Sequence, residues 1–469
     1  MIWDLMSFQK NIALEEGDQT YTYEDLFQIT EDICSHISER SLVFIVCRNV
    51  LGSIAGYVGF LNHNIVPLML EEKIDQNLLE ELIIQYRPAY LWVPIDQTDN
   101  FGKYTKLTEN SGYVLLKTNI TDSYAINDDL ALLINTSGSV GKPKLVRQSY
   151  NNIIANARSI IEYLSIDSKE KAITSLPMNY VYGLSVINSH LMAGASIVMT
   201  EYNCYEGKFW RLFNEKQATS FSGVPFMYEM LYKLKITKKE LPTLITMTQA
   251  GGKLSPELQD FFAHYADDNN KRFFVMYGAS EATSRMGYLP YQDAIRKRGS
   301  IGIPIPGGRY ELIDENDKLI TETNKTGELV YYGDNVTMGY ATCGDDLIKS
   351  DEWHGRLNTG DMAYRDDEGY YYITGRKKRF IKILGKRLSL DETEMRLRNI
   401  FNTIDLACAG SDDNLRVFIV DDSLKERINE YLMNTSHINP GHFRIQVIQE
   451  IPKNAAGKTL YGKLNEMEY

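Results

Sequence analysis

The chain has 469 residues, of which 43% are hydrophobic and 24% are charged, a composition typical of globular proteins with ample apolar material for buried cores. At about 150 residues per domain, this length predicts roughly three structural units. Fifty lysines and arginines against 62 aspartates and glutamates give a formal net charge of −12. A chain of this charge repels nucleic acids and anionic membranes, so we expect no nucleic-acid partner.

The sequence has no feature of a secreted, membrane-spanning or metal-cluster protein. No stretch approaches the run of about 18 apolar residues that a membrane span needs. The N-terminus places Asp4 and Lys10 inside its apolar part and lacks a basic leader, so we expect no secretory signal. The five cysteines are far apart and the seven histidines form no zinc-binding pair. We therefore expect a cytoplasmic protein with reduced cysteines and no metal cluster.

Short apolar runs alternate with longer amphipathic stretches through the first two thirds of the chain. The runs cover residues 42–46, 131–134, 195–199 and 273–276. Between them, residues 150–164 place their apolar side chains at helical spacing. This alternation predicts an α/β protein with mostly buried strands.

The composition and the hydrophobic pattern of the chain change past about residue 300. Glycines, tyrosines and short alternating runs predict an antiparallel or barrel-like section. Seven of the thirteen residues in 375–387, GRKKRFIKILGKR, are then lysine or arginine. A helix from Asp391, a strand at 415–420 and a helix at 423–433 are expected to follow. This shift predicts a boundary between a domain of residues 1–377 and a domain of residues 378–469.

The segment TSGSVGKPK, residues 136–144, directly follows one of the buried-strand candidates. Its glycines permit close approach of the backbone to a ligand, and its hydroxyls and lysines suit a polyphosphate. It is not a Walker loop, because Pro143 follows Lys142 where that motif needs serine or threonine. The alternative interpretation is an ordinary surface turn rich in serine and glycine.

This loop and six further motifs resemble, in the same order, those of the adenylate-forming enzymes, the superfamily of acyl-CoA synthetases, nonribosomal-peptide adenylation domains and luciferases. The resemblance covers nearly the whole chain. It implies a large N-terminal AMP-binding domain of α/β subdomains with a barrel-like section, and a small, mobile, hinged α+β domain at the C-terminus. The six motifs are LPMNYVYGLSV (176–186), QAGGKL (249–254), YGASE (277–281), NTGD (358–361), GRKKRFIKILGKR (375–387) and PKNAAGK (452–458).

Three residues receive catalytic roles from the resemblance. Lys458 is expected to place positive charge beside the attacking carboxylate and the α-phosphate. Glu281, with Thr136, is expected to hold the Mg²⁺ that bridges the ATP phosphates. Ser280 stands where the family usually has threonine, and since both carry a hydroxyl we expect a mild effect. Without the resemblance, Lys458 is a solvated tail lysine and Glu281 an exposed strand end.

The resemblance also assigns the nucleotide. Asp361 would accept hydrogen bonds from the ribose hydroxyls, because one carboxylate can serve both of them, and Arg376 would assist it. Tyr277 would stack on the adenine. The phosphate-binding residues implied are Thr136, Ser137, Gly138, Ser139, Gly141 and Lys144. The adenine- and ribose-binding residues implied are Gly251, Gly252, Tyr277, Gly278, Asp361 and Arg376.

The resemblance assigns the segment around the predicted boundary to the step in which a thiol takes up the activated acyl group. Lys378 stands at the position of the family's hinge residue, about which the C-terminal domain rotates. Lys382 and Gly385 are expected on the thiol side, where basic residues could steer the phosphates of CoA. Tyr461 departs from the family, which often has arginine there, and its effect is not predictable from the sequence.

The acyl pocket is expected to be apolar or aromatic. Val181 occupies the position at which amino-acid-activating members have aspartate, and an ammonium buried beside valine would be unpaired; α-amino acids are therefore disfavoured. Tyr180 stands where acyl-CoA synthetases often have histidine, and gating, hydrogen bonding and simple core packing remain open for it. The implied pocket residues are Tyr180, Val181, Val224, Ala250 and Ala279, with Met178, Met227 and Met286 nearby.

The expected activity is ATP-dependent conversion of a small carboxylic acid into acyl-AMP, followed by attack of a thiol and release of AMP. The thiol expected is that of CoA, and a phosphopantetheinyl carrier protein loaded with an acyl or amino acid is the alternative. A third possibility is a non-catalytic nucleotide-binding scaffold of the same fold. Retention of Glu281, Asp361, Arg376 and Lys458 together disfavours it, because a scaffold has no use for all four.

Overall fold

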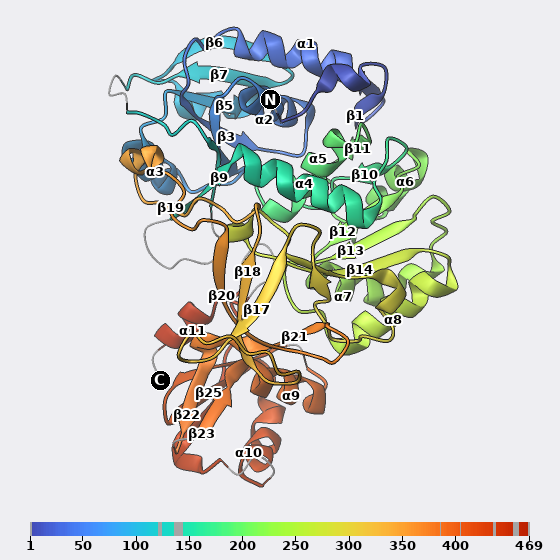
Figure 1. Ribbon diagram of the computed structural model, residues 1–469, viewed down its shortest axis with the longest axis vertical. Coiled ribbons are helices and arrows are strands. Elements are labelled where there is room, and N and C mark those ends of the chain that lie inside the picture. The colour runs from blue at the N-terminus through green and yellow to red at the C-terminus, as the bar shows by residue number, and fades with distance from the viewer. Residues whose placement is uncertain are drawn as a thin grey trace. The chain divides into compact units, whose positions relative to one another are not determined.

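The computed structural model describes residues 2–120, 124–135, 144–384, 386–403, 405–434, 438–453 and 459–467, with only the backbone for residues 378, 386 and 387. These residues form two compact units (Figure 1). The first comprises Met1–Arg309 and Tyr332–Leu357, and the second Tyr310–Tyr331 and Asn358–Tyr469. The boundary predicted between residues 377 and 378 falls inside the second unit and stays a prediction.

The first unit contains two large sheets. One has nine strands in the order β16-β15-β14-β13-β12-β10-β11-β1-β2. Its central strands, from β14 to β1, pair in parallel, and β2, β15 and β16 add antiparallel edges. The strands are β1 (Ile12–Glu16), β2 (Gln19–Thr22), β10 (Lys171–Ile173), β11 (Ser196–Met199), β12 (Ser220–Gly223), β13 (Thr246–Gln249), β14 (Arg272–Tyr277), β15 (Gly287–Leu289) and β16 (Ile303–Pro304).

The other sheet of this unit has eight strands in the order β19-β9-β8-β4-β3-β5-β7-β6. Strands β8, β4, β3 and β5 are parallel, while β9, β7 and β6 return antiparallel. Strand β19 comes from almost 200 residues further along the chain and pairs with β9. The strands are β3 (Leu42–Cys47), β4 (Val66–Glu71), β5 (Tyr90–Pro94), β6 (Thr105–Asn110), β7 (Tyr113–Lys117), β8 (Leu130–Asn135), β9 (Leu145–Ser149) and β19 (Tyr340–Ala341).

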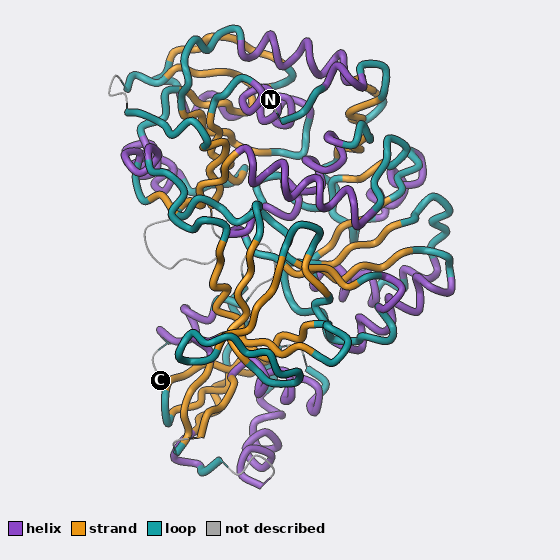
Figure 2. Tube along the Cα trace, viewed as in Figure 1, coloured by secondary structure: helices purple, strands orange, loops and turns teal. Residues whose placement is uncertain are grey.

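Helices pack between and outside these two sheets (Figure 2). Helix α4 packs on β8 and β9, α5 packs on β10 and β11, and the two helices pack on each other. Within the described ranges, no helix combines the length and apolarity that crossing a bilayer requires. The helices are α1 (Tyr23–Cys34), α2 (Leu51–Asn62), α3 (Gln76–Tyr86), α4 (Tyr150–Leu164), α5 (Val181–Met192), α6 (Gly207–Glu215), α7 (Pro225–Lys233) and α8 (Pro256–Asp268).

The predicted elements of this unit are confirmed. The four apolar runs fall on β3, β8, β11 and β14, whose side chains are almost all buried. Helix α4 has the bounds that its apolar spacing predicts. Its first turn is closed by a capping box, in which Ser149 and Asn152 each accept a hydrogen bond from the other's backbone N–H. The α/β fold class is therefore correct.

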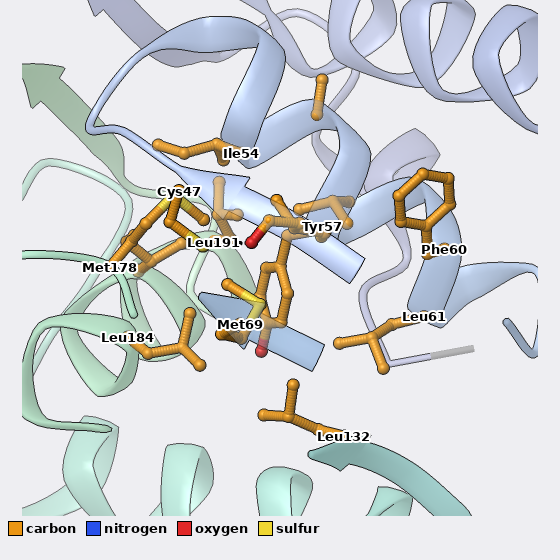
Figure 3. Packing of buried hydrophobic residues seen from close by; sticks show 14 of the residues in the cluster. Cys47, Ile54, Tyr57, Phe60, Leu61, Met69, Leu132, Met178, Leu184 and Leu191 are labelled. Atoms are coloured by element: carbon orange, nitrogen blue, oxygen red, sulfur yellow. Dashed lines mark hydrogen bonds between the residues drawn. The ribbon is translucent and has the colours of Figure 1, made fainter. Parts of the chain in front are cut away.

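A large apolar core lies between the two sheets (Figure 3). Ile54 and Tyr57 of α2, Met69 of β4 and Leu184 of α5 meet there, each at most 2% exposed. The hydroxyl of Tyr57 donates to Asn188 Oδ1 at 3.0 Å, so the one polar end of this ring is satisfied inside the core. Met178, just before α5, packs in this core and is 1% exposed.

His190, near the end of α5, is a buried histidine that cannot accept a proton at low cost. Its Nδ1 donates to the carbonyl oxygen of Val186 at 2.8 Å, while Nε2 is buried without a hydrogen-bond partner. Burial lowers the pKa of His190 from 6.5 to about 4, and the charge of nearby Arg285 lowers this pKa further.

Replacing His190 by asparagine is expected to reduce the acid sensitivity of the fold. The unfolded chain takes up a proton on His190 as the pH falls from about 6.5 towards 4, whereas the folded chain does not, so the free energy of unfolding falls over this window. A shift of this size corresponds to at most about 3 kcal/mol. Thermal unfolding of both proteins at closely spaced pH values tests this, because His190→Asn keeps a donor near Val186 and does not titrate. Parallel curves would contradict it.

The second unit is built from smaller sheets. Its four-stranded sheet, of order β17-β18-β20-β21, is open, so the section predicted as antiparallel or barrel-like does not close into a barrel among the described strands. The predicted helix from Asp391, strand at 415–420 and helix at 423–433 correspond to α9, β25 and α10. The elements are β17 (Arg309–Ile313), β18 (Gly327–Tyr332), β20 (Arg356–Arg365), β21 (Tyr371–Arg376), β22 (Phe380–Ile383), β23 (Lys386–Ser389), α9 (Leu390–Phe401), β24 (Leu406–Ser411), β25 (Asn414–Ile419), α10 (Lys425–Asn434), β26 (Phe443–Val447) and α11 (Tyr461–Glu466).

Candidate active site

The carboxyl ends of neighbouring parallel strands bring several predicted site residues to one edge of the nine-stranded sheet. Gly223 of β12 pairs with Gln249 of β13, and Gln249 pairs with Val275 of β14. The chain segments that leave these strands therefore emerge side by side. They carry the predicted residues Val224, Ala250, Gly251, Gly252, Tyr277, Gly278, Ala279, Ser280 and Glu281. Open α/β sheets bind ligands at this kind of edge.

The turn after β13 forms one wall of this edge. Gly251 has φ +83°, and a Cβ atom there would lie 2.5 Å from the hydroxyl of Tyr180 and 3.1 Å from a methyl of Val224. Only glycine fits such a position. The turn is held by Gln249, whose Nε2 donates to the carbonyl oxygen of Gly252 at 2.9 Å. Tyr180, Val224 and Gly251 are thus brought together.

Two further predicted pocket residues adjoin this wall along the chain. Ala250, 6% exposed, follows β13 directly, and Val181, 7% exposed, begins α5 next to Tyr180. The ring of Tyr180 meets that of Tyr182 edge to face, with centroids 6.3 Å apart. The wall is therefore mainly apolar and aromatic.

The turn after β14 holds Glu281 in place. Gly278 passes so close to the backbone of the following loop that a Cβ atom there would lie 1.8 Å from the carbonyl oxygen of Ser284. Glu281 sits in the short 3₁₀ helix Ser280–Ala282. Its carbonyl oxygen accepts hydrogen bonds from both the backbone N–H and the hydroxyl of Thr337, each at 3.0 Å.

The side chain of Glu281 lies in a small polar constellation with Tyr340 and Lys144. The hydroxyl of Tyr340 donates to Glu281 Oε1 at 2.8 Å, and the Lys144 ammonium lies 5.9 Å from the centre of the Tyr340 ring. Burial and the Glu281 carboxylate raise the pKa of Tyr340, so this hydroxyl stays protonated and donates. Tyr340 is one of 31 tyrosines, and no motif distinguishes it in the sequence.

This constellation fits a magnesium ion held together with substrate phosphates. Among the described residues, Glu281 Oε2 accepts no hydrogen bond, so one carboxylate oxygen is open to a cation while Oε1 fixes the group. Mg²⁺ in phosphate-transfer sites is typically held by one or two carboxylates plus the phosphates themselves. Thr136, the other predicted ligand, lies outside the described residues.

Most of the predicted phosphate loop lies outside the described residues, namely Thr136, Ser137, Gly138, Ser139 and Gly141. The strands on either side of it are well defined, since Asn135 of β8 pairs with Leu145 of β9. Tyr340 of β19 pairs with Val146, the next residue of β9. The β19–β9 pairing therefore places Tyr340 and Glu281 next to the strand on which the predicted loop ends.

In the second unit, the structure brings together the two residues predicted to bind ribose. Asp361 of β20 and Arg376 of β21 are directly opposite each other in the ladder. Arg376 Nε lies 2.7 Å from Asp361 Oδ1, and the carboxylate side chain is 6% exposed while the arginine is 58% exposed. The arrangement presents a buried carboxylate whose orientation is set by a surface cation.

The predicted hinge region is described only in part. Lys378 lies in the short 3₁₀ helix Lys377–Arg379, with its backbone alone described. Lys382 is exposed on β22, and Gly385 and Lys458 fall outside the described residues. The neighbouring Lys377 is 2.6 Å from Glu328 and ties this helix to β18.

Tyr461, the departure from the family pattern, has a defined place in the second unit. Its hydroxyl donates to Glu394, with oxygen distances of 2.9 and 3.1 Å, and the Arg379 guanidinium stacks 3.5 Å from its ring centre. Glu394, 5% exposed, also accepts a hydrogen bond from the backbone N–H of Cys408 at 2.8 Å. Tyr461 thus anchors α11, which begins three residues after Lys458, to α9 and to the residue after Lys378.

The chain is similar to known AMP-binding enzymes and CoA ligases along most of its length. The family model described as AMP-binding enzyme matches residues 4–341. The 2-succinylbenzoate–CoA ligase of Oceanobacillus iheyensis is 25% identical over 99% of this chain and 97% of its own length. The long-chain-fatty-acid–CoA ligase of Bacillus subtilis is 24% identical over 90% of this chain and 73% of its own length.

The fold has close counterparts among solved structures. The o-succinylbenzoate coenzyme A synthetase of Bacillus subtilis, in complex with ATP and magnesium ion, superposes with a TM-score of 0.80. The match covers 98% of this chain and 99% of that chain, at 20% sequence identity. The likeness extends over both compact units and confirms the predicted type of fold.

Proposed function

Because this chain belongs to the AMP-binding enzyme family, we propose that it is an AMP-forming ligase that joins a carboxylic acid to the thiol of CoA. The observation that supports this most directly is the match to a 2-succinylbenzoate–CoA ligase along 99% of this chain and 97% of that enzyme. A match of this extent includes the family's C-terminal part as well as its nucleotide-binding part.

The first half-reaction forms an acyl adenylate. A carboxylate oxygen of the acid attacks the α-phosphorus of ATP, an O–P bond forms, and pyrophosphate leaves. Lys144 and the loop before it bind the phosphates, and Glu281, oriented by Tyr340, would hold the metal. Magnesium bound there supplies positive charge that offsets the charge of the phosphates. Lys458 stabilises the two anions as they approach each other.

The nucleotide itself is bound by the residues that the resemblance assigned to its base and its sugar. Tyr277, Gly278, Gly251 and Gly252 serve the adenine, and the carboxylate of Asp361 accepts hydrogen bonds from the ribose hydroxyls. Supporting this assignment, Arg376 holds the Asp361 carboxylate in one orientation, which favours simultaneous recognition of two neighbouring hydroxyls.

The second half-reaction transfers the acyl group. The CoA thiolate attacks the acyl carbonyl carbon, a thioester forms, and AMP leaves with the electrons of the broken C–O bond. Rotation about Lys378 between the two half-reactions would exchange the groups that face the acyl adenylate. The curated relatives named above are CoA ligases, which favours CoA over a phosphopantetheinyl carrier protein as the acceptor.

An acid-dependent exchange assay tests this function. Purified protein is incubated with ATP, Mg²⁺ and radiolabelled pyrophosphate together with each of a set of short, long, aryl, hydroxy and α-amino acids. We expect label to enter ATP with one class of acid, and CoA to be consumed with that acid. Exchange without CoA consumption would indicate a carrier-protein acceptor. Absence of exchange with every acid, in protein that binds ATP, would support a scaffold role instead.

A further inference from the structure

Arg285 is a buried arginine eight residues after Tyr277, on the segment that leads into β15. It is 2% exposed. Its Nε donates to the hydroxyl of Ser185 at 3.2 Å and its Nη1 donates to the hydroxyl of Tyr163 at 2.9 Å. Its guanidinium carbon lies 5.2 Å from the centre of the Tyr182 ring. All of these partners are neutral.

No acidic side chain neutralises this cation within the described part of the chain. The other buried arginine of this unit, Arg147, is paired with Glu352, and half-buried Arg272 is paired with Glu170. A buried charge without a counter-ion is costly, and hydroxyls and a ring face offset only part of that cost. The field of Arg285 also contributes to the lowered pKa of His190, as expected of a charge that no carboxylate balances. An anionic partner from outside the chain would complete this site.

The guanidinium lies behind the aromatic wall of the candidate acyl pocket. Tyr182, on which it stacks, meets Tyr180 edge to face, and Tyr180 borders Gly251. The Tyr182 ring is fixed by a hydrogen bond between its hydroxyl and that of Thr248, at 2.8 Å. Arg285 is therefore two rings away from the turn at which the pocket begins.

A small cavity with polar groups lies beside this arginine. It has room for about one water-sized group, about 10 Å³, and Val181 of the predicted acyl pocket lines it. Its lining includes the hydroxyl of Ser185, which accepts the Arg285 hydrogen bond, so the cavity reaches a contact of the guanidinium from the side of the predicted acyl pocket.

We propose that Arg285 recognises a second carboxylate at the far end of the acyl substrate, so that the enzyme activates dicarboxylic acids. The carboxylate to be activated reacts at the strand ends, and the hydrocarbon between the two carboxylates packs along Tyr180, Val181 and Val224. The distal carboxylate then pairs with the Arg285 guanidinium. The inference rests on the proposed function and specifies its substrate class.

Matched pairs of acids test the inference. Each pair differs only in a second terminal carboxylate, as in butanoate and succinate, hexanoate and adipate, or octanoate and suberate. We expect the wild-type protein to favour the diacid of at least one pair in pyrophosphate exchange. Arg285→Met should lower kcat/KM for that diacid about a hundredfold, the usual cost of removing one member of a buried charge pair, and spare the monoacid. Arg285→Lys should restore part of the preference.

The control is Arg158→Met, which removes the same charge from an exposed position on α4 and should leave both acids unaffected. Equal losses with the mono- and diacid in Arg285→Met, or a wild-type preference for every monoacid, would overturn the inference and leave the proposed function standing. If Arg285→Met does not fold, a lysine variant that keeps part of the diacid preference supports recognition by charge, and equal losses with the mono- and diacid in Arg285→Lys count against it. Absence of exchange with all acids would overturn inference and function together.

Discussion

Replacing Lys458 by alanine is expected to slow acyl-adenylate formation by a factor of about a hundred to a thousand while ATP binding is retained. In this step an anionic carboxylate approaches an anionic phosphate, and a fixed positive charge lowers the barrier only when it is aligned with both. Removing one such pre-positioned group typically costs about 3 to 4 kcal/mol of transition-state stabilisation. Pyrophosphate release in a single turnover, with ATP affinity measured separately, gives both quantities.

The chain offers a matched control in Lys453, an exposed lysine of the same PKNAAGK motif whose backbone bridges to Thr459. Lys453→Ala removes the same charge from the same segment, and we expect it to react at nearly the wild-type rate. Supplying the Lys458→Ala protein with presynthesised acyl-AMP and CoA should give thioester at a near-normal rate, because that step involves no attack on phosphorus. Unchanged pyrophosphate release in Lys458→Ala would remove this lysine from the mechanism.

The elements that the sequence predicted are those determined by local patterns. The apolar spacing of residues 150–164 is a property of one segment, and α4 begins and ends where that spacing does. The buried strands β3, β8, β11 and β14 likewise follow from uninterrupted apolar runs. The basic segment around Arg376 and the glycine-containing motifs can be recognised in the sequence for the same reason, because each is a feature of adjacent residues.

Contacts that depend on distant strand pairing were not predictable. Tyr340 reaches Glu281 only because β19 joins the edge of the sheet beside β9, about 190 residues earlier in the chain. Strand β1 joins the nine-stranded sheet through Leu14 and Ile197, a pairing that no local pattern indicates. The role of Arg285 is not predictable either, because an arginine in a loop segment is normally exposed, whereas its burial depends on Tyr163 of α4 and Ser185 of α5.

The contacts of Tyr461 also depend on tertiary structure, because Arg379 and Glu394 come from other segments of the chain. Motif comparison indicates only that an arginine is often expected at this position. In the folded unit, the positive charge is supplied from elsewhere by Arg379, which stacks on the tyrosine ring, and Glu394 accepts the tyrosine hydrogen bond. The tyrosine ring and a cation from another segment thus lie together at the position whose effect could not be predicted from the sequence.

Glutamine in place of Glu281 is expected to lower kcat/KM for ATP about a hundredfold or more and to raise the Mg²⁺ concentration needed for half-maximal rate. The substitution keeps the shape of the side chain and an oxygen that can accept the Tyr340 hydrogen bond, but it removes the negative charge that binds the metal. Measuring pyrophosphate exchange over a series of Mg²⁺ concentrations separates metal binding from catalysis, because only a metal-ligand role predicts partial rescue at high Mg²⁺.

Two further variants make the Glu281 experiment specific. Tyr340→Phe keeps the charge and removes one hydrogen bond, so we expect a loss of about tenfold or less, with a smaller shift in Mg²⁺ dependence. Glu257→Gln changes the same chemical group at an exposed position on α8, paired with Arg298, and should be neutral. If Glu281→Gln reacted at full rate with an unchanged Mg²⁺ requirement, the metal would have to be held by other oxygens, and the hydrogen bond from Tyr340 would then serve only to fix the turn after β14.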